Sequence, residues 1–179
     1  VSYNSIEENR SCRNLYISNL DGSDAHLATR SGKSISNARW SADGKKVAYL
    51  MGGQIYIAKL RKDGTLGKGK KVSDIAAGIG EFKLSPDQSQ VIFLSTVAGR
   101  VKTPGQIYPD LPKAEAYETE TMMYRHWDHW VEEIPHSFVG TFDWDNGLGN
   151  FFDILGNEGA EDGGVSPYEL PTEPFGGLE

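Results

Sequence analysis

The sequence predicts an all-β protein, a partial β-propeller, from three observations. Its 179 residues include 21 glycines, many of which follow Asp, Lys or another Gly, as they do in turns between short strands. The stretch RWSADGKKVAYL at 39–50 aligns without gaps on KLSPDQSQVIFL at 83–94, at an offset of 44 residues. In the same way, NLYISNLDG at 14–22 resembles QIYIAKLRKDG at 54–64. A period of about 40–45 residues that carries four short strands is the repeat of a propeller blade.

Each of the two longer repeats begins with a Ser-x-Asp turn. Ser41 and Asp43 can bond backbone amides ahead of them, and Gly44 accepts a left-handed conformation. In the second copy Pro86 fixes the first turn position. The strands that follow, KVAYL and QVIFL, are apolar at nearly every position, whereas a strand with one wet face alternates. We therefore expect both strands to be covered on both faces, with a generic β-sandwich as the alternative fold.

Three further segments are predicted to be loops or turns. The basic, glycine-rich stretch 60–71 indicates a solvated hairpin loop between strands. The stretch DWDNGLGN at 143–150 lacks both the Asp-x-Asp-x-Asp-Gly register and the closing Glu of a calcium loop, so a hairpin turn is favoured. The acidic stretch 156–171 is typical of a long surface loop.

Repeat number, charge and cysteine content narrow the domain organisation and the class of partner. Only two Ser-x-Asp turns are present, and closing a propeller takes about four to eight blades, so we expect about three blades of a longer propeller. With a net charge of −7 and scattered Lys and Arg, the chain lacks the basic stripe that nucleic acid requires. No apolar run is long enough to span a membrane. Cys12 is the only cysteine, so neither an internal disulfide nor a thiolate zinc site is expected.

The stretch MMYRHWDHWVEEIPHSFVG at 122–140 concentrates aromatic, histidine and acidic residues, a composition that occurs in several kinds of site. A metal site would use the side chains of His126, Asp128 and His129, with His136 as a further ligand, but their spacing fits no strong template. Nucleic-acid binding needs more Lys and Arg among the aromatics than this stretch contains.

Two other interpretations of the same stretch are catalytic and structural. A nucleophile–base pair of Ser137 and His136 is disfavoured, because adjacent residues of a strand point to opposite faces. A buried aromatic strut is favoured instead. Tyr124, Trp127 and Trp130 recur at every third position, which is a rough helical stripe. The segment is therefore expected to be an aromatic helical or irregular insertion in the propeller.

The longer motifs carry a family resemblance. The turn-plus-strand repeats resemble the TolB-like (Tol-type) propeller repeat. The segment YPDLPKAEAYETETMMYRHWDHWVEEIPHSFVG at 108–140 and the segment PYELPTEPFGGLE at 167–179 resemble the propeller of bacterial dipeptidyl peptidase V-type enzymes and related acylaminoacyl peptidases of the prolyl oligopeptidase family. In that family an N-terminal propeller caps an α/β-hydrolase domain with a Ser-Asp-His triad. The resemblance implies that residues 1–179 are part of the propeller domain.

The resemblance also implies a function for the parent protein. It would be a serine exopeptidase that releases dipeptides from peptide N-termini, with the propeller limiting entry to short peptides. The nucleophile elbow G-x-S-x-G does not occur in this sequence, so the hydrolase domain is expected to be absent from it and this chain alone to be inactive. No metal and no cofactor are expected. The expected partners are short peptides and the protein's own hydrolase domain, and the expected location is the bacterial periplasm or another extracytoplasmic space.

Candidate substrate-binding residues follow from that function. A dipeptidyl peptidase must recognise a free α-ammonium, which carboxylates beside aromatic walls can do. By transfer from the family, Glu132 and Glu133 are candidates for the carboxylates, and Trp130 and Tyr124 for the aromatic walls. The alternative for the two acids is a solvated pair before Pro135. The alternative functions are a Tol-type propeller that only binds proteins, and an acylaminoacyl peptidase, which cleaves blocked N-termini.

Overall fold

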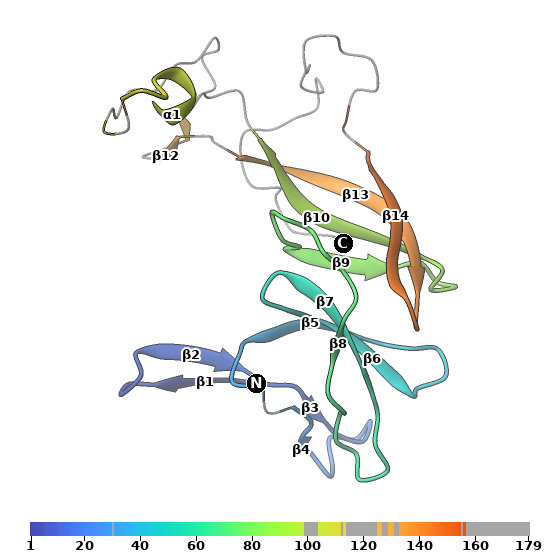
Figure 1. Cartoon of the computed structure of the whole chain (residues 1–179). Coiled ribbons are helices and arrows are strands. Elements are labelled where there is room, and N and C mark those ends of the chain that lie inside the picture. Colours follow the sequence, from blue (N-terminus) through green and yellow to red (C-terminus); the bar gives the residue numbers. More distant parts are fainter. Residues whose placement is uncertain are drawn as a thin grey trace.

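The computed structural model is an all-β arrangement in which two four-stranded antiparallel sheets lie one above the other (Figure 1). The only helix among the residues it describes is the one-turn α1 (Pro104–Ile107). No helix in that described part is long and apolar enough to cross a membrane. The described residues are 1–29, 31–98, 104–111, 113, 125–126, 129–130, 133–154 and 156.

The first sheet is a meander in which each strand pairs with the next. Its order is β5 (Ile35–Trp40), β6 (Lys46–Met51), β7 (Gln54–Lys59) and β8 (Lys70–Lys71). The loop from β7 to β8 is a hairpin connection closed by a bridge between Leu60 and Leu66, as the basic, glycine-rich stretch predicted.

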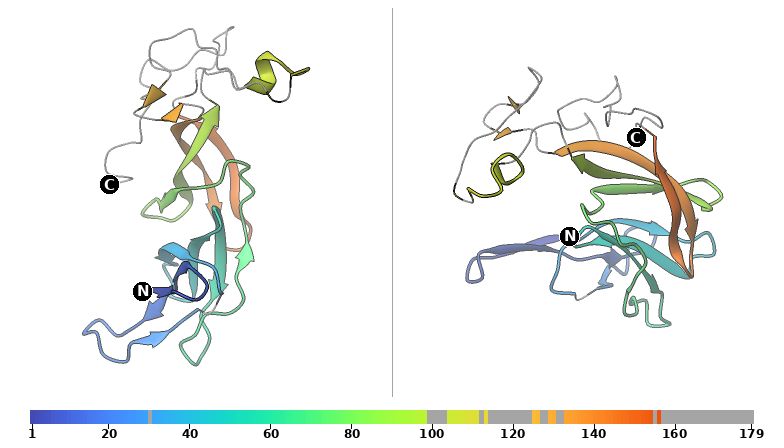
Figure 2. Two further views of the ribbon diagram at one scale, coloured as in Figure 1. Left: turned by 90° about the vertical axis from the view of Figure 1, so that its left-hand side faces the viewer. Right: turned by 45° about the horizontal axis from the view of Figure 1, so that its top comes forward.

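The second sheet repeats this order. Its strands are β9 (Glu81–Leu84), β10 (Gln90–Ala98), β13 (Glu133–Asp143) and β14 (Gly147–Asp153). The two repeats found in the sequence therefore occupy equivalent places, at the first turn and second strand of two different sheets, which confirms the prediction from the 44-residue offset. The hairpin turn predicted within 143–150 is also confirmed, because β13 and β14 pair on either side of it. Figure 2 shows the second sheet above the first from two other directions.

The two Ser-x-Asp turns are built alike. In the first turn the Ser41 hydroxyl donates to Asp43 Oδ1 at 2.6 Å and accepts the Lys46 amide at 2.9 Å. In the second turn the Ser85 hydroxyl makes the same two bonds, to Asp87 at 2.6 Å and from the Gln90 amide at 3.0 Å. The hydrogen-bonding role expected of the Ser and the Asp is therefore confirmed in both copies.

The left-handed position of the turn differs between the copies. Gly44 has φ +67°, as expected, and Gln88 holds the equivalent place with φ +59°. A side chain in this conformation is strained, so an interaction elsewhere must compensate. The Gln88 amide supplies it by reaching the first sheet. It donates to the Trp40 carbonyl at 3.0 Å, and its oxygen accepts the Ala42 amide at 2.9 Å.

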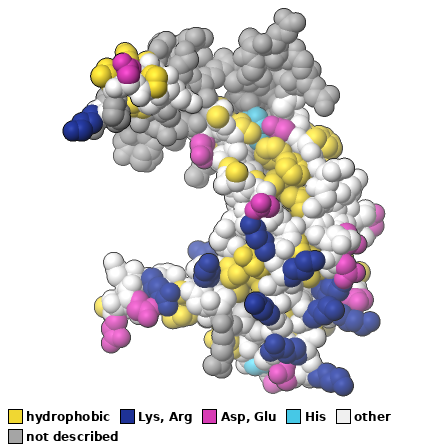
Figure 3. Space-filling view, viewed as in Figure 1, with side chains coloured by type: hydrophobic (Ala, Val, Ile, Leu, Met, Phe, Trp, Pro, Cys, Tyr) yellow, Lys and Arg dark blue, Asp and Glu magenta, His cyan; other side chains and the backbone are white. Residues whose placement is uncertain are grey.

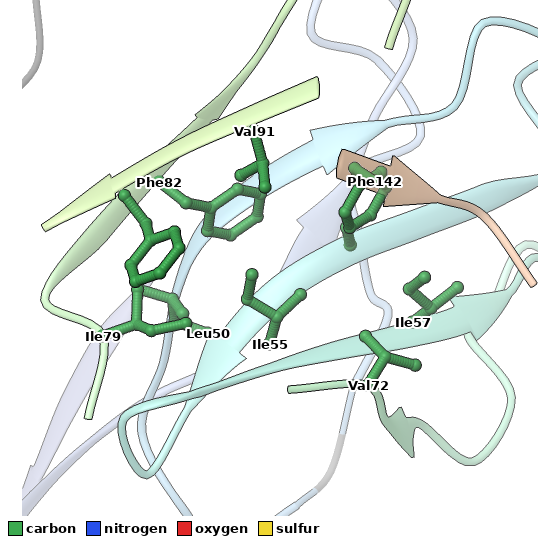
Figure 4. Close-up of a cluster of buried hydrophobic side chains, with 10 residues drawn as sticks. Leu50, Ile55, Ile57, Val72, Ile79, Phe82, Val91 and Phe142 are labelled. Atoms are coloured by element: carbon green, nitrogen blue, oxygen red, sulfur yellow. The ribbon is translucent and has the colours of Figure 1, made fainter. Parts of the chain in front are cut away.

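The main core lies between the two sheets (Figure 4). Among its residues Ile55, Phe82 and Phe93 have no exposed surface. Burying a side chain of this size contributes about 1.5–3 kcal/mol, so these contacts hold the sheets together. The buried members of this core are Ala48, Leu50, Ile55, Ile57, Val72, Ile79, Phe82, Val91, Phe93 and Phe142.

A second core covers the opposite face of the first sheet. Val47 and Tyr49 of β6 pack there with Ala28, and Leu15 and Ile17 of the N-terminal region join them. Consequently β6 is covered on both faces, as its apolar run predicted. In β10 the residues alternate instead, since Val91 and Phe93 are buried while Ile92 and Leu94 are only half-buried. The prediction is therefore confirmed for one strand and only partly for the other.

The remaining strands form three pairs. β1 (Ser2–Ser5) pairs with β2 (Arg10–Arg13), β3 (Tyr16–Ile17) with β4 (His26–Leu27), and β11 (Arg125–His126) with β12 (His129–Trp130). The described part of the aromatic segment is therefore extended, which corrects the expectation of a helical stripe for these four residues. A tight pairing of His126 with His129 sets this backbone geometry. Tyr124 and Trp127 of the proposed stripe lie outside the described residues.

Candidate functional site at one end of the second sheet

The insertion that carries the predicted site leaves and returns at one end of the second sheet. Glu133 is the first residue of β13, and its Cα pairs with that of Ala98, the last residue of β10. The chain between them, 99–132, is therefore attached at this end. α1 and β12 lie beyond it in Figure 1. β10 pairs with β13 along its whole length, from Gln90 to Ala98, and this pairing holds the two ends of the insertion side by side.

Glu133 is held in place while its side chain stays exposed to solvent. The Thr96 hydroxyl on β10 donates to Glu133 Oε2 at 2.7 Å. Thr96 can reach because it is two residues from the cross-strand partner of Glu133 and so lies on the same face of the sheet. A carboxylate oriented in this way at the root of the insertion can accept hydrogen bonds from an ammonium group.

The other predicted site residues are not placed relative to Glu133. Glu132 and Tyr124 lie outside the described residues. For Trp130 the structure describes the backbone, which is part of β12 and pairs with Arg125. The proposed grouping of two acids with aromatic walls therefore stays a prediction.

His136 forms a buried polar pair that the sequence did not indicate. Only 3% of its surface is exposed, and its Nδ1 lies 2.6 Å from Asp153 Oδ2 on β14. Ser137 belongs to the opposite face of β13, and its carbonyl accepts the amide of Ile154 at 3.0 Å. The nucleophile–base pairing of His136 with Ser137 is therefore not formed, for the reason that strand alternation gave. Asp153 was missed because only the register of the β13–β14 hairpin brings it to His136.

An aromatic cluster lies on the same face as His136. Phe93 stacks on Phe138 with ring centres 5.2 Å apart, and Phe151 packs edge-on against Phe93 at 5.5 Å. Phe138 alternates with His136 along β13, which is why both face the first sheet. The cluster packs against β13, the strand that begins at Glu133, and so helps to hold the base of the insertion in place.

A hollow of ≈ 680 Å³ lies between the β4 region and the first sheet. Its wall includes Tyr49 and Tyr56, whose rings stack at 5.9 Å. Burial raises the pKa of Tyr49, and the neighbouring Tyr56 adds to this effect. No His or Cys is among the described residues that line this hollow, so it offers no nucleophile–base pair. In the described part of the chain no three His, Cys, Asp or Glu side chains gather as metal ligands would.

Comparisons with known proteins identify relatives of the chain. No protein-family model matches it. Dipeptidyl-peptidase 5 of Porphyromonas gingivalis is 35% identical over 181 residues, a match that covers 100% of this chain and 25% of that protein. Dipeptidyl-peptidase 5 of Porphyromonas endodontalis is 33% identical over 146 residues, 79% of this chain and 20% of its own length. The chain thus spans a quarter or less of the curated relatives that it matches.

A solved structure gives the matching fold. Part of the Pyrococcus horikoshii acylaminoacyl peptidase superposes with a TM-score of 0.52 over 85% of this chain and 22% of that one. The sequences are 19% identical, so this likeness concerns the fold alone. Together the comparisons confirm the resemblance that the long motifs indicated.

Proposed function

This chain is a relative of the dipeptidyl-peptidase 5 proteins that matches part of their length, and from that premise we propose that it is a portion of the β-propeller of a serine exopeptidase. The parent protein releases dipeptides from peptide N-termini in an extracytoplasmic compartment. The portion described here gates the entry of short peptides and anchors their N-terminus. The observation that carries the proposal is the repetition of one four-stranded meander in equivalent sequence positions.

The way in which the two sheets pack supports a propeller over a sandwich. Ala48 and Leu50 of β6 lie together with Val91 and Phe93 of β10 in the shared core. At the offset of 44 residues, Val91 and Phe93 are equivalent to Val47 and Tyr49, which lie on the other face of the first sheet. Unlike faces therefore meet, so the contact is head-to-tail and can be repeated in one direction. Head-to-tail contacts generate a closed ring where the rotation between neighbours closes, as it does between the blades of a propeller.

The outer face of the second sheet is also consistent with head-to-tail packing against a further sheet. Ile92 and Leu94 are the equivalents of Ala48 and Leu50, which the second sheet buries. Both Ile92 and Leu94 are half-buried in the described part of the structure. A further blade packed on this face would bury them as fully as their counterparts. This supports the assignment of the chain to a longer propeller.

The substrate-anchoring role rests on the position of Glu133 at the root of the insertion. Its exposed carboxylate, oriented by Thr96, is suited to a charge-assisted hydrogen bond with the substrate ammonium. Glu132 is its partner in this role, and Trp130 and Tyr124 form the aromatic walls. The acyl transfer itself is done by a Ser-Asp-His triad in a hydrolase domain outside this chain.

Kinetics of the intact protein test the anchor. A charge-assisted hydrogen bond contributes about 1.5–3 kcal/mol, so Glu132→Gln or Glu133→Gln should lower kcat/KM on free dipeptidyl substrates by roughly ten- to a hundredfold. The effect should vanish on the same peptides with a blocked N-terminus, because these carry no ammonium group. Glu7→Gln, an exposed acid in the β1–β2 turn, is the control and should leave both rates unchanged.

Two results would count against this role. If both variants cleave free substrates as the wild type does, the ammonium is anchored elsewhere. If both lose activity equally on free and blocked peptides, the acids are structural. Faster cleavage of blocked than of free peptides by the wild type would instead favour the acylaminoacyl alternative.

A further inference from the structure

A second hollow lies where the turns of the two sheets meet, on the far end of the sheets from the insertion. It has a volume of ≈ 320 Å³, which is at the small end of ligand pockets. Its lining combines residues of the first sheet with the turn between β13 and β14. These residues are Lys46, Ile57, Lys59, Gly67, Lys68, Lys70, Val72, Trp144 and Asp145.

Four of the lining side chains are lysines, and only one is an acid. Only 18% of the Lys46 side chain is exposed, and its Nζ lies 2.6 Å from Asp145 Oδ1. Lys70 donates to the backbone carbonyl of Asp145 at 3.0 Å. For Lys59 and Lys68 the described residues provide no carboxylate partner. The hollow therefore carries an excess of positive charge within a chain whose net charge is −7.

The folding of the chain concentrates this charge. Lys59 ends β7, Lys68 precedes β8, and Lys46 starts β6, so the antiparallel pairing of these strands brings all three to one edge. In Figure 3 Lys and Arg side chains gather over the lower sheet. Cations held close together repel one another, and an anion that enters between them relieves this repulsion.

The floor of the hollow is apolar and rigid. Ile57 and Val72 form part of it, and Figure 4 shows them side by side below Phe142. The Trp144 ring packs edge-on against Phe142 with centres 5.4 Å apart. The indole N–H donates to Gln88 Oε1 at 3.0 Å. The indole is therefore fixed before any ligand arrives, and a fixed aromatic wall costs little entropy on binding.

We propose that this hollow binds a small aromatic carboxylate. The carboxylate lies between the ammonium groups of Lys59 and Lys68, and the ring rests on Ile57, Val72 and the Trp144 indole. The volume excludes larger anions such as oligonucleotides. An inorganic anion would pair with the lysines but would leave the apolar floor and the indole uncovered, whereas an aromatic carboxylate uses both. This site lies apart from the insertion and does not depend on the peptidase function proposed above.

Saturation-transfer NMR on the intact protein tests the site with three probes. Benzoate should bind with a measurable dissociation constant in the millimolar range, and its affinity should fall as salt is added. Acetate lacks the ring and benzyl alcohol lacks the charge, so both should bind at least about fivefold more weakly than benzoate. If either binds as well as benzoate, the combined site is wrong.

Matched variants locate the binding. Lys59→Gln/Lys68→Gln should weaken benzoate about five- to tenfold, because two ammonium groups are lost. Lys33→Gln/Lys62→Gln removes the same charge at exposed positions outside the hollow and should leave the affinity unchanged. Circular dichroism should show that both variants unfold like the wild type. Equal weakening by the two variants, or no weakening by the first, would overturn the proposal.

Discussion

His26 is a single residue whose protonation state follows from its contacts. Its Nδ1 lies 2.8 Å from the carbonyl of Asp24, and its Nε2 lies 3.1 Å from the carbonyl of Gly64. A neutral imidazole has one N–H and can donate to only one of these acceptors. The charged ring donates to both, so the two carbonyls, the first of them most strongly, raise the pKa of His26. The ring thereby ties β4 to the loop that follows β7.

The contribution of His26 to stability should depend on pH. Because the folded-state pKa is raised above about 6.5, the stabilisation is fully present below that value and is lost as the pH rises through the folded pKa. Urea denaturation of the wild type and His26→Gln should therefore differ more at pH 5.5 than at pH 8.5. The hydrogen bond from the Thr65 hydroxyl lowers the pKa of the nearby Asp63 carboxyl, so this acid stays charged throughout this range. A difference between the two proteins that does not change with pH would show that the ring bonds in its neutral form.

At the scale of elements, the β13–β14 hairpin is attached to the first sheet through its turn. The Leu148 amide donates to the Val72 carbonyl at 3.0 Å, and Asp143 accepts the amides of Asp145 and Asn146 within the turn. Gly147 lies between Asn146 and Leu148 in the chain and has φ +89°. A Cβ at this position would overlap the Val72 side chain. The hairpin can approach the first sheet only because this position has no side chain.

Gly147→Ala should destabilise the protein by about 2–4 kcal/mol, which combines the cost of a positive φ with that of overpacking. Gly22→Ala is the matched control. It has a similar φ of +82° but nothing within 4 Å, so it should cost only about 1 kcal/mol. Urea denaturation measures both. If the two substitutions lowered the free energy of unfolding equally, the backbone around Val72 would have to shift at no cost to accommodate the new Cβ.

At the scale of the whole molecule, two sheets stack with unlike faces in contact, and the proposed function places the catalytic triad in a part of the protein outside this chain. Among the described residues Ser137 follows His136 directly, but the two side chains lie on opposite faces of β13 and so are not placed as a nucleophile and its base. Under the proposed function this chain holds a substrate, and the covalent chemistry takes place elsewhere in the protein.

Labelling of the intact protein tests whether the nucleophilic serine lies outside this chain. A serine-directed fluorophosphonate should label the protein once, because the proposed hydrolase domain holds an activated serine. Mass spectrometry after digestion should find the label outside residues 1–179. The unlabelled serines of this chain, Ser137 included, act as internal controls. A stoichiometric label on any peptide of this chain would refute the assignment.

Much of the backbone arrangement was determined by the sequence alone. The Ser41 and Asp43 turn, its copy at Ser85 and Asp87, and the coverage of β6 on both faces all follow from contacts within a few residues or from a simple period. Such patterns specify local hydrogen bonds and strand order, which is why the repeat correctly placed the two segments in different sheets. The family resemblance rested on longer motifs of the same kind.

Only the tertiary structure decided which distant residues meet. It joined Gln88 to Trp144, His136 to Asp153, and Lys46 to Asp145, pairs that no spacing in the sequence relates. It also made the described part of the aromatic segment extended, where a stripe at every third residue had suggested a helix. The physical reason is the same in each case. These contacts depend on how one sheet packs against another and on hairpin register, and both are set by the summed packing of the core rather than by any local run of residues.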